Sequence, residues 1–271
     1  MPRYGQIDHD YAIRLATTTA EDDGPVWMVN LMRYKDRAEY VDGRETTLTG
    51  READDEYAPL GPMAAVGAAP VFVADVVFEF LGDSPSWERI AFARYPTRRA
   101  VIEMQEREDF RRQHEHKEAG MAEKIVIGSQ PMAAPPIDEP VDWAEVPHPP
   151  TEDDGPFTMV HVIRFHDDDG AATTPDRMEA YQEVAGSVAV PHGVRIDGWF
   201  SAEGTIIGDG RSWHQVRFNT FPSREAFLAV ALDPARARAQ DEHREPAIAD
   251  TYAIGARATI NRLAASIDDG S

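Results

Sequence analysis

The chain of 271 residues contains no cysteine, few basic residues and no long apolar run. Without cysteine there is no disulfide framework, no thiolate nucleophile and no thiolate metal site. Only 27 lysines and arginines stand against 48 aspartates and glutamates, which gives a formal net charge of −21. This charge argues against nucleic acid or an anionic membrane surface as a partner, and it indicates an acidic, solubilised surface. No stretch predicts a membrane span or a signal peptide, so we expect a cytoplasmic protein.

Several catalytic motifs are missing as well. The sequence has no GxxxxGKS or GxGxxG phosphate loop and no GxSxG elbow, so nucleotide-dependent chemistry and serine hydrolysis have little support. The HExxH spacing is absent, and His114 and His116 are two residues apart, which places them on different faces of a helix. We therefore predict no cofactor site and no metal site. The pair Glu115-His116 recurs as Glu242-His243, which indicates a structural role for these histidines.

The sequence does contain an internal repeat. Four short segments recur in the same order, each about 130 residues after its first copy. The matched segments are 21–25 with 152–156, 82–87 with 208–213, 95–98 with 221–224, and 115–118 with 242–245. Four ordered matches at a nearly constant separation indicate a tandem duplication with small loop insertions.

The composition along the chain predicts five parts. Residues 131–150 are rich in proline and acid and lack periodicity, which predicts a linker between the two copies, held to a domain surface by Trp143. The predicted parts are an N-terminal arm (1–20), a first repeat (21–130), the linker (131–150), a second repeat (151–265) and a C-terminal tail (266–271).

Each copy predicts the same series of elements. In the first copy, strands are expected over 26–32, 71–80, 88–94 and 124–128, and helices around 51–66, after Thr97 and through 115–118. Thr97, and Ser223 in the second copy, are predicted helix N-caps because each follows a proline at the end of a strand. The order is βαββαβ, which is a ferredoxin-like unit.

These residues resemble a known family. Met28-Val29-Asn30-Leu31, the turn from Gly82 to Trp87 and the strand end Tyr95-Pro96-Thr97 are similar to the DUF1330 family of the dimeric α/β-barrel superfamily. The resemblance implies an α+β fold in which two ferredoxin-like repeats bring their antiparallel sheets face to face, so that one chain forms the barrel. A monomer or a weak homodimer is then expected. The superfamily includes cofactor-free monooxygenases, isomerases, dehydratases, decarboxylases and haem proteins, so the fold alone does not assign a reaction.

The alternation of side chains along the strands separates two faces of the sheet. One face is apolar in both copies, and we expect it to meet the helices. The other face is mixed, and we expect it to face the partner sheet and to line a ligand cavity inside the barrel. The residues expected on this mixed face are Asn30, Asp75, Glu79 and Arg89 in the first copy and His161, Trp199, Glu203 and Arg217 in the second.

The candidate site follows from this arrangement. We predict that His161 is the acid or base and that Glu203 orients it, since histidine is the side chain whose ordinary pKa lies nearest neutral pH. The predicted substrate-binding residues are Asn30, Asp75, Glu79, Arg89, Trp199 and Arg217. Two alternatives stay open: His161 is a hydrogen-bonded structural group, or Glu203 and Glu79 form ion pairs with Arg217 and Arg89.

The hypothesis for function is a small-molecule enzyme without a cofactor. A lyase, an isomerase or a cofactor-independent monooxygenase acting on a small aromatic or acidic substrate fits these residues. The alternative is a non-catalytic barrel that binds a metabolite.

Overall fold

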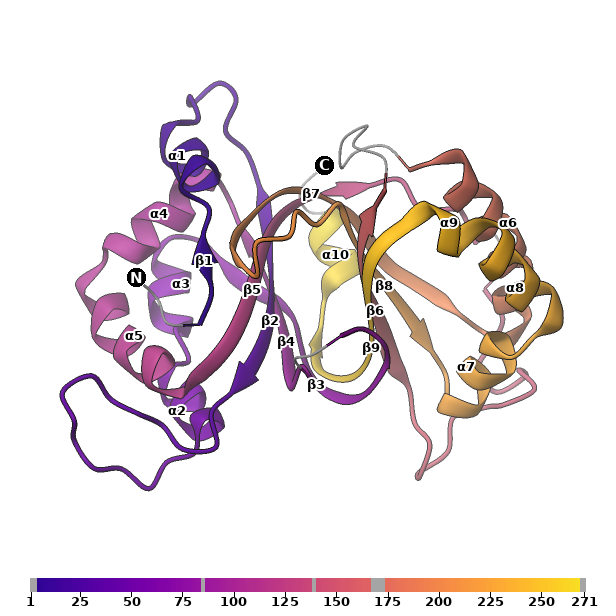
Figure 1. Ribbon diagram of the computed structural model, residues 1–271, viewed down its shortest axis with the longest axis horizontal. Helices are drawn as coiled ribbons and strands as arrows, with labels where there is room; N and C mark the ends of the chain where they lie inside the picture. Colours follow the sequence, from indigo (N-terminus) through magenta and orange to yellow (C-terminus); the bar gives the residue numbers. More distant parts are fainter. Residues whose placement is uncertain (1–3, 84–85, 138–139, 167–173, 269–271) are drawn as a thin grey trace.

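The computed structural model describes residues 4–83, 86–137, 140–166 and 174–268, and in this part of the chain eight strands close into one antiparallel barrel (Figure 1). Neighbouring strands follow the order β7-β5-β2-β4-β3-β9-β6-β8, and pairing of β8 with β7 closes the ring. The strands are β2 (Val26–Tyr34), β3 (Ala69–Leu81), β4 (Arg89–Tyr95), β5 (Met121–Met132), β6 (Phe157–Phe165), β7 (Arg195–Gly208), β8 (Gln215–Phe221) and β9 (Ile248–Asn261).

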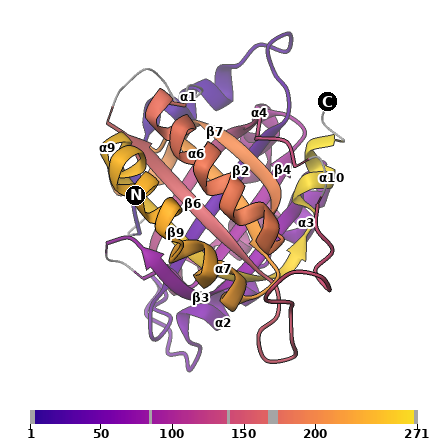
Figure 2. The same ribbon diagram turned by 90° about the vertical axis from the view of Figure 1, so that its right-hand side faces the viewer.

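The helices cover the outside of the barrel in two groups, on opposite sides (Figure 1). The first group is α2 (Gly50–Tyr57), α3 (Leu60–Ala65), α4 (Arg98–Glu106) and α5 (Glu108–Gly120). The second group is α6 (Asp176–Ala189), the 3-10 helix η1 (Val190–His192), α7 (Arg224–Ala231), α8 (Pro234–Ala239), the π-helix η2 (Gln240–Arg244) and α9 (Glu245–Ala247). In each half, strands and helices follow the predicted order. Figure 2 shows α6 lying across the outer face of the second half.

The predicted helix caps are confirmed. The hydroxyl of Thr97 accepts a hydrogen bond from the backbone N–H of Ala100, and the hydroxyl of Ser223 accepts one from Ala226, each at 3.0 Å. A side-chain oxygen at this position satisfies one of the free N–H groups of the first helical turn. These caps fix where α4 and α7 begin above the sheet.

The interior of the barrel is filled by apolar side chains from all eight strands. Phe92 on β4 stacks on Phe218 on β8 with ring centroids 5.3 Å apart, and these two strands are opposite each other in the ring. Phe72 and Phe200 complete this aromatic layer, and all four rings are fully buried. An eight-stranded barrel is just wide enough for its own side chains to fill it.

The predicted assignment of the two faces is therefore wrong. The apolar face points into the barrel, and the mixed face points outward beneath the helices. The alternation identified which residues share a face, but both faces are covered in this fold. In β3 the alternation also breaks, because a register shift between Val76 and Phe78 turns Phe78 outward against Phe157 and Phe227.

Both predicted terminal arms belong to the fold. Strand β1 (Gln6–Ile7) pairs with β7, and helix α1 (His9–Thr17) buries Tyr11 and Leu15. Helix α10 (Leu263–Asp268) covers one end of the barrel, where Leu263 joins the interior cluster and the indole N–H of Trp27 donates to Ser266 Oγ at 3.0 Å. Residues 1–3 and 269–271 of the predicted arm and tail lie outside the described residues, as do 84–85 of the matched turn and 138–139 of the linker.

The predicted attachment of the linker is confirmed, since Trp143 Nε1 donates to the carbonyl of Gly193 at 2.7 Å. Strand β5 continues into the predicted linker as far as Met132. None of the helices in the described part of the chain is both long and apolar enough to cross a membrane.

Candidate functional site

Two cavities lie between the sheet and its covering helices, one in each half of the barrel. The first cavity, of about 710 Å³, contains Asn30 on β2, and the second cavity, of about 560 Å³, contains His161 on β6. The prediction that one cavity inside the barrel joins these two residues is wrong, because aromatic side chains fill that space. Asn30 and His161 instead hold corresponding positions in two separate cavities.

The floor of the second cavity is a row of three side chains on adjacent strands. His161 on β6 pairs in register with Arg217 on β8, which pairs in turn with Trp199 on β7. The Arg217 guanidinium stacks on the Trp199 ring at 4.2 Å, and its Nε donates to Gln215 Oε1 at 3.0 Å. Trp199 is held in place because its Nε1 donates to Asn219 Oδ1 at 3.0 Å. One face and one edge of the guanidinium group are thus held in place before any ligand arrives.

Helical residues complete the second cavity with two more arginines. Arg236 on α8 donates from Nε to the hydroxyl of Tyr181 on α6 at 3.1 Å. Arg244, the last residue of η2, is buried and donates to Thr251 Oγ1 at 3.5 Å. Three guanidinium groups therefore line one cavity in a chain of strongly negative charge.

These arginines have no carboxylate partner within the described residues. None of the ion pairs found there includes Arg217, Arg236 or Arg244. Glu183 is the one carboxylate among the described residues that line the second cavity, and its side chain is exposed. Arg217 and Arg244 are buried, and burying a cation without an ion-pair partner is costly, so this arrangement favours an anionic ligand.

The electrostatics of the second cavity keep His161 neutral. Burial, followed by the charges of Arg244, Arg217 and Arg236, lowers the pKa of His161 to about 3. Burial and the nearby Arg244 lower the pKa of Arg217 to about 9, although Tyr181 acts in the opposite direction. In the described part of the chain, no hydrogen bond engages the His161 imidazole. Its nitrogens are therefore available to a ligand.

Glu203 is not placed to orient His161. It lies on β7 where that strand passes into the first half, and it forms an ion pair with Arg98 on α4. Glu203 also accepts hydrogen bonds from Gln130 Nε2 at 2.6 Å and from the Tyr11 hydroxyl at 3.2 Å. The predicted His161–Glu203 pair is wrong, because these partners hold Glu203 away from the second cavity.

The remaining predicted residues of the first half are also engaged with their own partners. Asp75 forms ion pairs with Arg51 at 2.5 Å and with Arg89 at 3.7 Å. Glu79 accepts the backbone N–H of Trp87 at 2.7 Å. The alternative ion pairs, Glu203 with Arg217 and Glu79 with Arg89, are therefore not formed.

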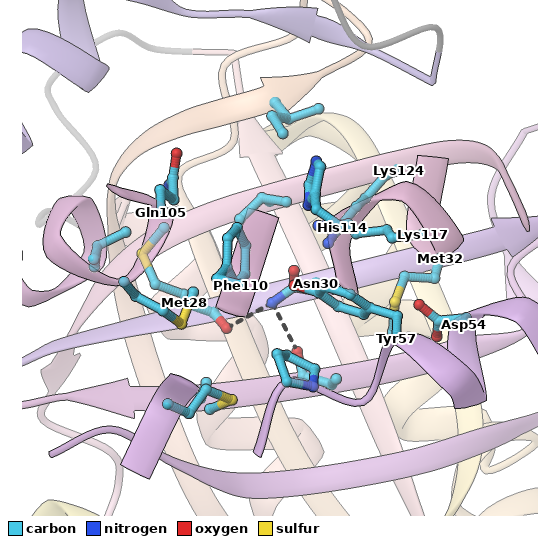
Figure 3. A pocket seen from close by; sticks show the side chains of 18 of the residues that line it. Met28, Asn30, Met32, Asp54, Tyr57, Gln105, Phe110, His114, Lys117 and Lys124 are labelled. Atoms are coloured by element: carbon cyan, nitrogen blue, oxygen red, sulfur yellow. Dashed lines mark hydrogen bonds between the residues drawn. The ribbon is translucent and has the colours of Figure 1, made fainter. Parts of the chain in front are cut away.

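The first cavity has a different set of polar groups (Figure 3). Asn30 Nδ2 donates to the carbonyls of Met28 at 3.0 Å and Ala91 at 3.3 Å, so its amide is tied to the sheet. Arg89 is neutralised by Asp54 at 3.1 Å and by Asp55 at 2.7 Å. The cavity is also lined by His114, Lys117 and Lys124, which come from α5 and β5. The first cavity thus has Asn30 at the position of His161, and its buried cations are lysines where the second cavity has arginines.

The sequence interpretation missed Tyr181, Arg236 and Arg244. A signal for Arg244 was present, since Lys117 in Glu-His-Lys-Glu matches Arg244 in Glu-His-Arg-Glu. Both cations are buried and line their respective cavities. The residue between His and Glu was thus the informative one in this repeated tetrapeptide.

Comparisons with known proteins bear on the fold. No family model matches the chain, and no curated protein matches it. Among solved structures, the chain is similar to an anthrone oxidase-like protein with 13% identity and a TM-score of 0.51, over 91% of this chain and 98% of that one. It is also similar to a chlorite dismutase variant from Candidatus Nitrospira defluvii, with 12% identity and a TM-score of 0.47, over 91% of this chain and 95% of that one.

A protein of unknown function from Rhodopseudomonas palustris matches with 23% identity and a TM-score of 0.42, over 48% of this chain and 98% of that one. The similarity to the anthrone oxidase-like protein concerns the fold alone, and it agrees with the eight-stranded barrel. The chain therefore has an α+β fold with a closed antiparallel barrel of eight strands, which is consistent with a dimeric α/β barrel fold.

Proposed function

We propose that the chain is an enzyme that binds a small organic anion in the second cavity and moves a proton on it at His161. The observation that carries the proposal is the convergence of three arginines without a carboxylate partner, in the described residues, around a neutral imidazole. Arginine presents planar paired donors that match a carboxylate, so a carboxylic acid is the ligand class that fits best. A bound carboxylate would offset the desolvation of the arginines.

The roles of the lining residues follow from their contacts. Arg217 is held flat on Trp199, which leaves its outer edge free to receive a carboxylate. Arg244 and Arg236 approach from the helices and would bind the same anion from the other side. The apolar part of the substrate would lie against Trp199 and the apolar lining contributed by Phe221, Phe227 and Val230. An aromatic or otherwise flat acid suits such a cavity.

Binding of the anion would prepare His161 for its role. Before a ligand binds, burial and then the charges of the three arginines disfavour the imidazolium and hold the pKa of His161 low. A carboxylate among them cancels part of that field, and the pKa of His161 rises toward its ordinary range. His161 then becomes an effective base when the substrate is present. The same arginines would stabilise the negative charge that develops when a proton leaves a carbon next to the carboxylate.

This chemistry is shared by isomerases, lyases and cofactor-independent monooxygenases that begin with removal of a proton from carbon. A first step common to all three classes can be measured without knowing the final product. Removal of a proton from an acidic substrate is therefore the step assigned to His161.

The test is deuterium exchange into a panel of small aromatic and aliphatic carboxylic acids in D₂O, read by mass spectrometry. Two variants replace residues of the second cavity with those at the corresponding positions of the first half. They are His161→Asn, since Asn30 corresponds to His161, and Arg217→Ala, since Ala91 corresponds to Arg217. His161→Asn should keep binding and lower exchange by at least about 100-fold, the lower end of what a positioned base contributes. Arg217→Ala should weaken binding about 10- to 100-fold, because it removes a charged hydrogen bond in a buried site.

Two outcomes would redirect the proposal. Binding without exchange in the wild-type protein would favour the alternative, a non-catalytic metabolite-binding barrel. Equal binding by wild type and Arg217→Ala would mean that the arginines are not an anion site.

We also infer that the two halves arose by tandem duplication of a DUF1330-like ferredoxin unit. The four ordered sequence matches and the repeated order of strands and helices support this origin. Since β3 pairs with β9 and β5 with β7, the strand pairing between the halves is supplied within the chain. We therefore propose that the protein is a monomer or a weak homodimer.

A further inference from the structure

The chain has three lysines and 24 arginines, and two of those lysines lie side by side in the first cavity. Lys117 on α5 and Lys124 on β5 are 7% and 5% exposed. Figure 3 shows both side chains beside His114. The third, Lys35, forms an ion pair with Glu39 at 2.9 Å near the surface. Two of the three lysines of the chain therefore lie in the first cavity.

The two amines are costly to keep charged together. Lys117 and Lys124 are both buried, line the same cavity and act on each other, and two ammonium groups in such a place repel, which favours a neutral amine at one of them. Burial lowers the pKa of Lys117 as well, but Lys117 is the better placed to keep its proton, because Glu118 acts on it alone and the ring of Tyr57 lies 5.2 Å from its Nζ. Burial, and then the charge of Lys117, lowers the pKa of Lys124 well below its usual range.

The second half has a different cation at this position. Arg244 matches Lys117, and Thr251 matches Lys124. Arginine keeps its proton near neutral pH, whereas a buried lysine readily loses it. A chain that uses arginine for nearly every other positive charge has retained lysine where a neutral amine can form. This choice favours a chemical role over simple charge.

We propose that the first cavity is a second ligand site, in which the amine of Lys124 forms an imine with a small, uncharged aldehyde or ketone. The lone pair of Lys124 attacks the carbonyl carbon, and the carbonyl oxygen takes a proton from the ammonium of Lys117. Lys117 recovers a proton from the Lys124 nitrogen and passes it to the same oxygen, which leaves as water when the C=N bond forms. Lys117 then takes the remaining proton from that nitrogen and is an ammonium again, so the amine and the carbonyl compound yield only an imine and water, and nothing is oxidised or reduced. Lysine amines that are desolvated or lie beside another cation are known to act as nucleophiles of this kind.

The first cavity suits an apolar carbonyl compound. Its wall contains Met28, Met63, Met104 and Phe110, and its volume is about 710 Å³. It reaches solvent, because Leu60 lines it and is 58% exposed. The nearby imidazole is uncharged as well, since burial and then the charge of Lys117 lower the pKa of His114 to about 3. An uncharged ligand can therefore bind without adding another buried charge to the cavity.

The experiment traps the imine with butanone and sodium cyanoborohydride at pH 7, followed by peptide mass spectrometry of the three lysines. Lys35 is the internal reference. An ordinary lysine is neutral about once in two thousand molecules at pH 7, so a neutral Lys124 should be labelled at least about 100-fold faster. Equal labelling of Lys124 and Lys35 would overturn the proposal.

Variants test the division of roles. Lys117→Arg keeps the charge that Arg244 supplies in the second half but cannot carry protons, so labelling of Lys124 should fall at least about tenfold. Lys124→Thr, after Thr251, should abolish fast labelling, and Lys124→Met serves the same purpose if the threonine variant does not fold. Fast labelling that persists at Lys117 in either variant would overturn the assignment to Lys124. His161→Asn should leave the labelling unchanged, which separates this site from that of the second cavity.

Discussion

Replacing His161 with asparagine should make the protein less sensitive to acid. His161 has a pKa of about 3 in the folded protein and an ordinary value of 6.5 when the chain is unfolded. Between these values the unfolded state binds a proton at this site and the folded state does not. The free energy of unfolding therefore falls as pH drops from 6.5 toward 3, and the full contribution is present above pH 6.5.

The magnitude can be worked out for pH 5.0. The pH is then 1.5 below the ordinary pKa of 6.5, and each pKa unit corresponds to about 1.36 kcal/mol. Wild type should lose about 2 kcal/mol through His161 between pH 7.5 and pH 5.0. His161→Asn cannot lose this amount, and asparagine already occupies the corresponding position in the first half, Asn30.

The assay is urea unfolding of both proteins at pH 7.5 and pH 5.0. The quantity of interest is the change in the free energy of unfolding between the two pH values, compared between wild type and variant. The exposed His9 provides a control, because His9→Asn should retain the pH dependence of wild type. If wild type and His161→Asn respond to acid within about 0.5 kcal/mol of each other, His161 is not buried and neutral as described, and the proposed base loses its physical foundation.

Three further predictions concern the architecture. Phe92→Ala should lower the free energy of unfolding by about 3–5 kcal/mol, because it leaves a cavity in the aromatic layer inside the barrel. If urea unfolding shows a loss below about 1 kcal/mol, the interior is not packed as described. Glu203→Gln should cost about 2 kcal/mol by weakening the pair with Arg98, yet leave acid binding in the second cavity unchanged by calorimetry. Light scattering should give a mass near the 30.1 kDa of one chain, and a tight dimer would contradict the proposed monomer or weak homodimer.

Much of the fold could be predicted from the sequence because it depends on local signals. The four repeated segments and the strand periodicity indicated the order of strands and helices, and the polar residues after Pro96 and Pro222 marked the helix starts. What periodicity could not decide was which face of the sheet points into the barrel. A strand covered on both sides carries apolar residues on both faces, as the burial of both Met28 and Val29 illustrates.

The candidate site was predicted in part for the same reason. Periodicity placed His161, Arg217 and Trp199 on one face, and the strand register brings them into one row. The partner of a charged residue depends on contacts between distant segments, so nothing local indicated that Glu203 pairs with Arg98. The arginines of α8 and η2 reach the cavity only because the second helical group folds back over the sheet.

The two cavities differ in a way that a pair of identical subunits could not achieve. In the first half the row beneath the helices is Asn30, Ala91 and Val73, and at the matching strand positions of the second half it is His161, Arg217 and Trp199. A symmetric dimer must carry each substitution twice, so an arginine that benefits one cavity also enters the other. Within one chain each cavity is free of that constraint. Guanidinium groups that stay charged gather in the second cavity, and amines that can lose a proton gather in the first. This separation places each kind of cation where the proposed chemistry would use it, while Asp54 and Glu203 form ion pairs with arginines of the first half.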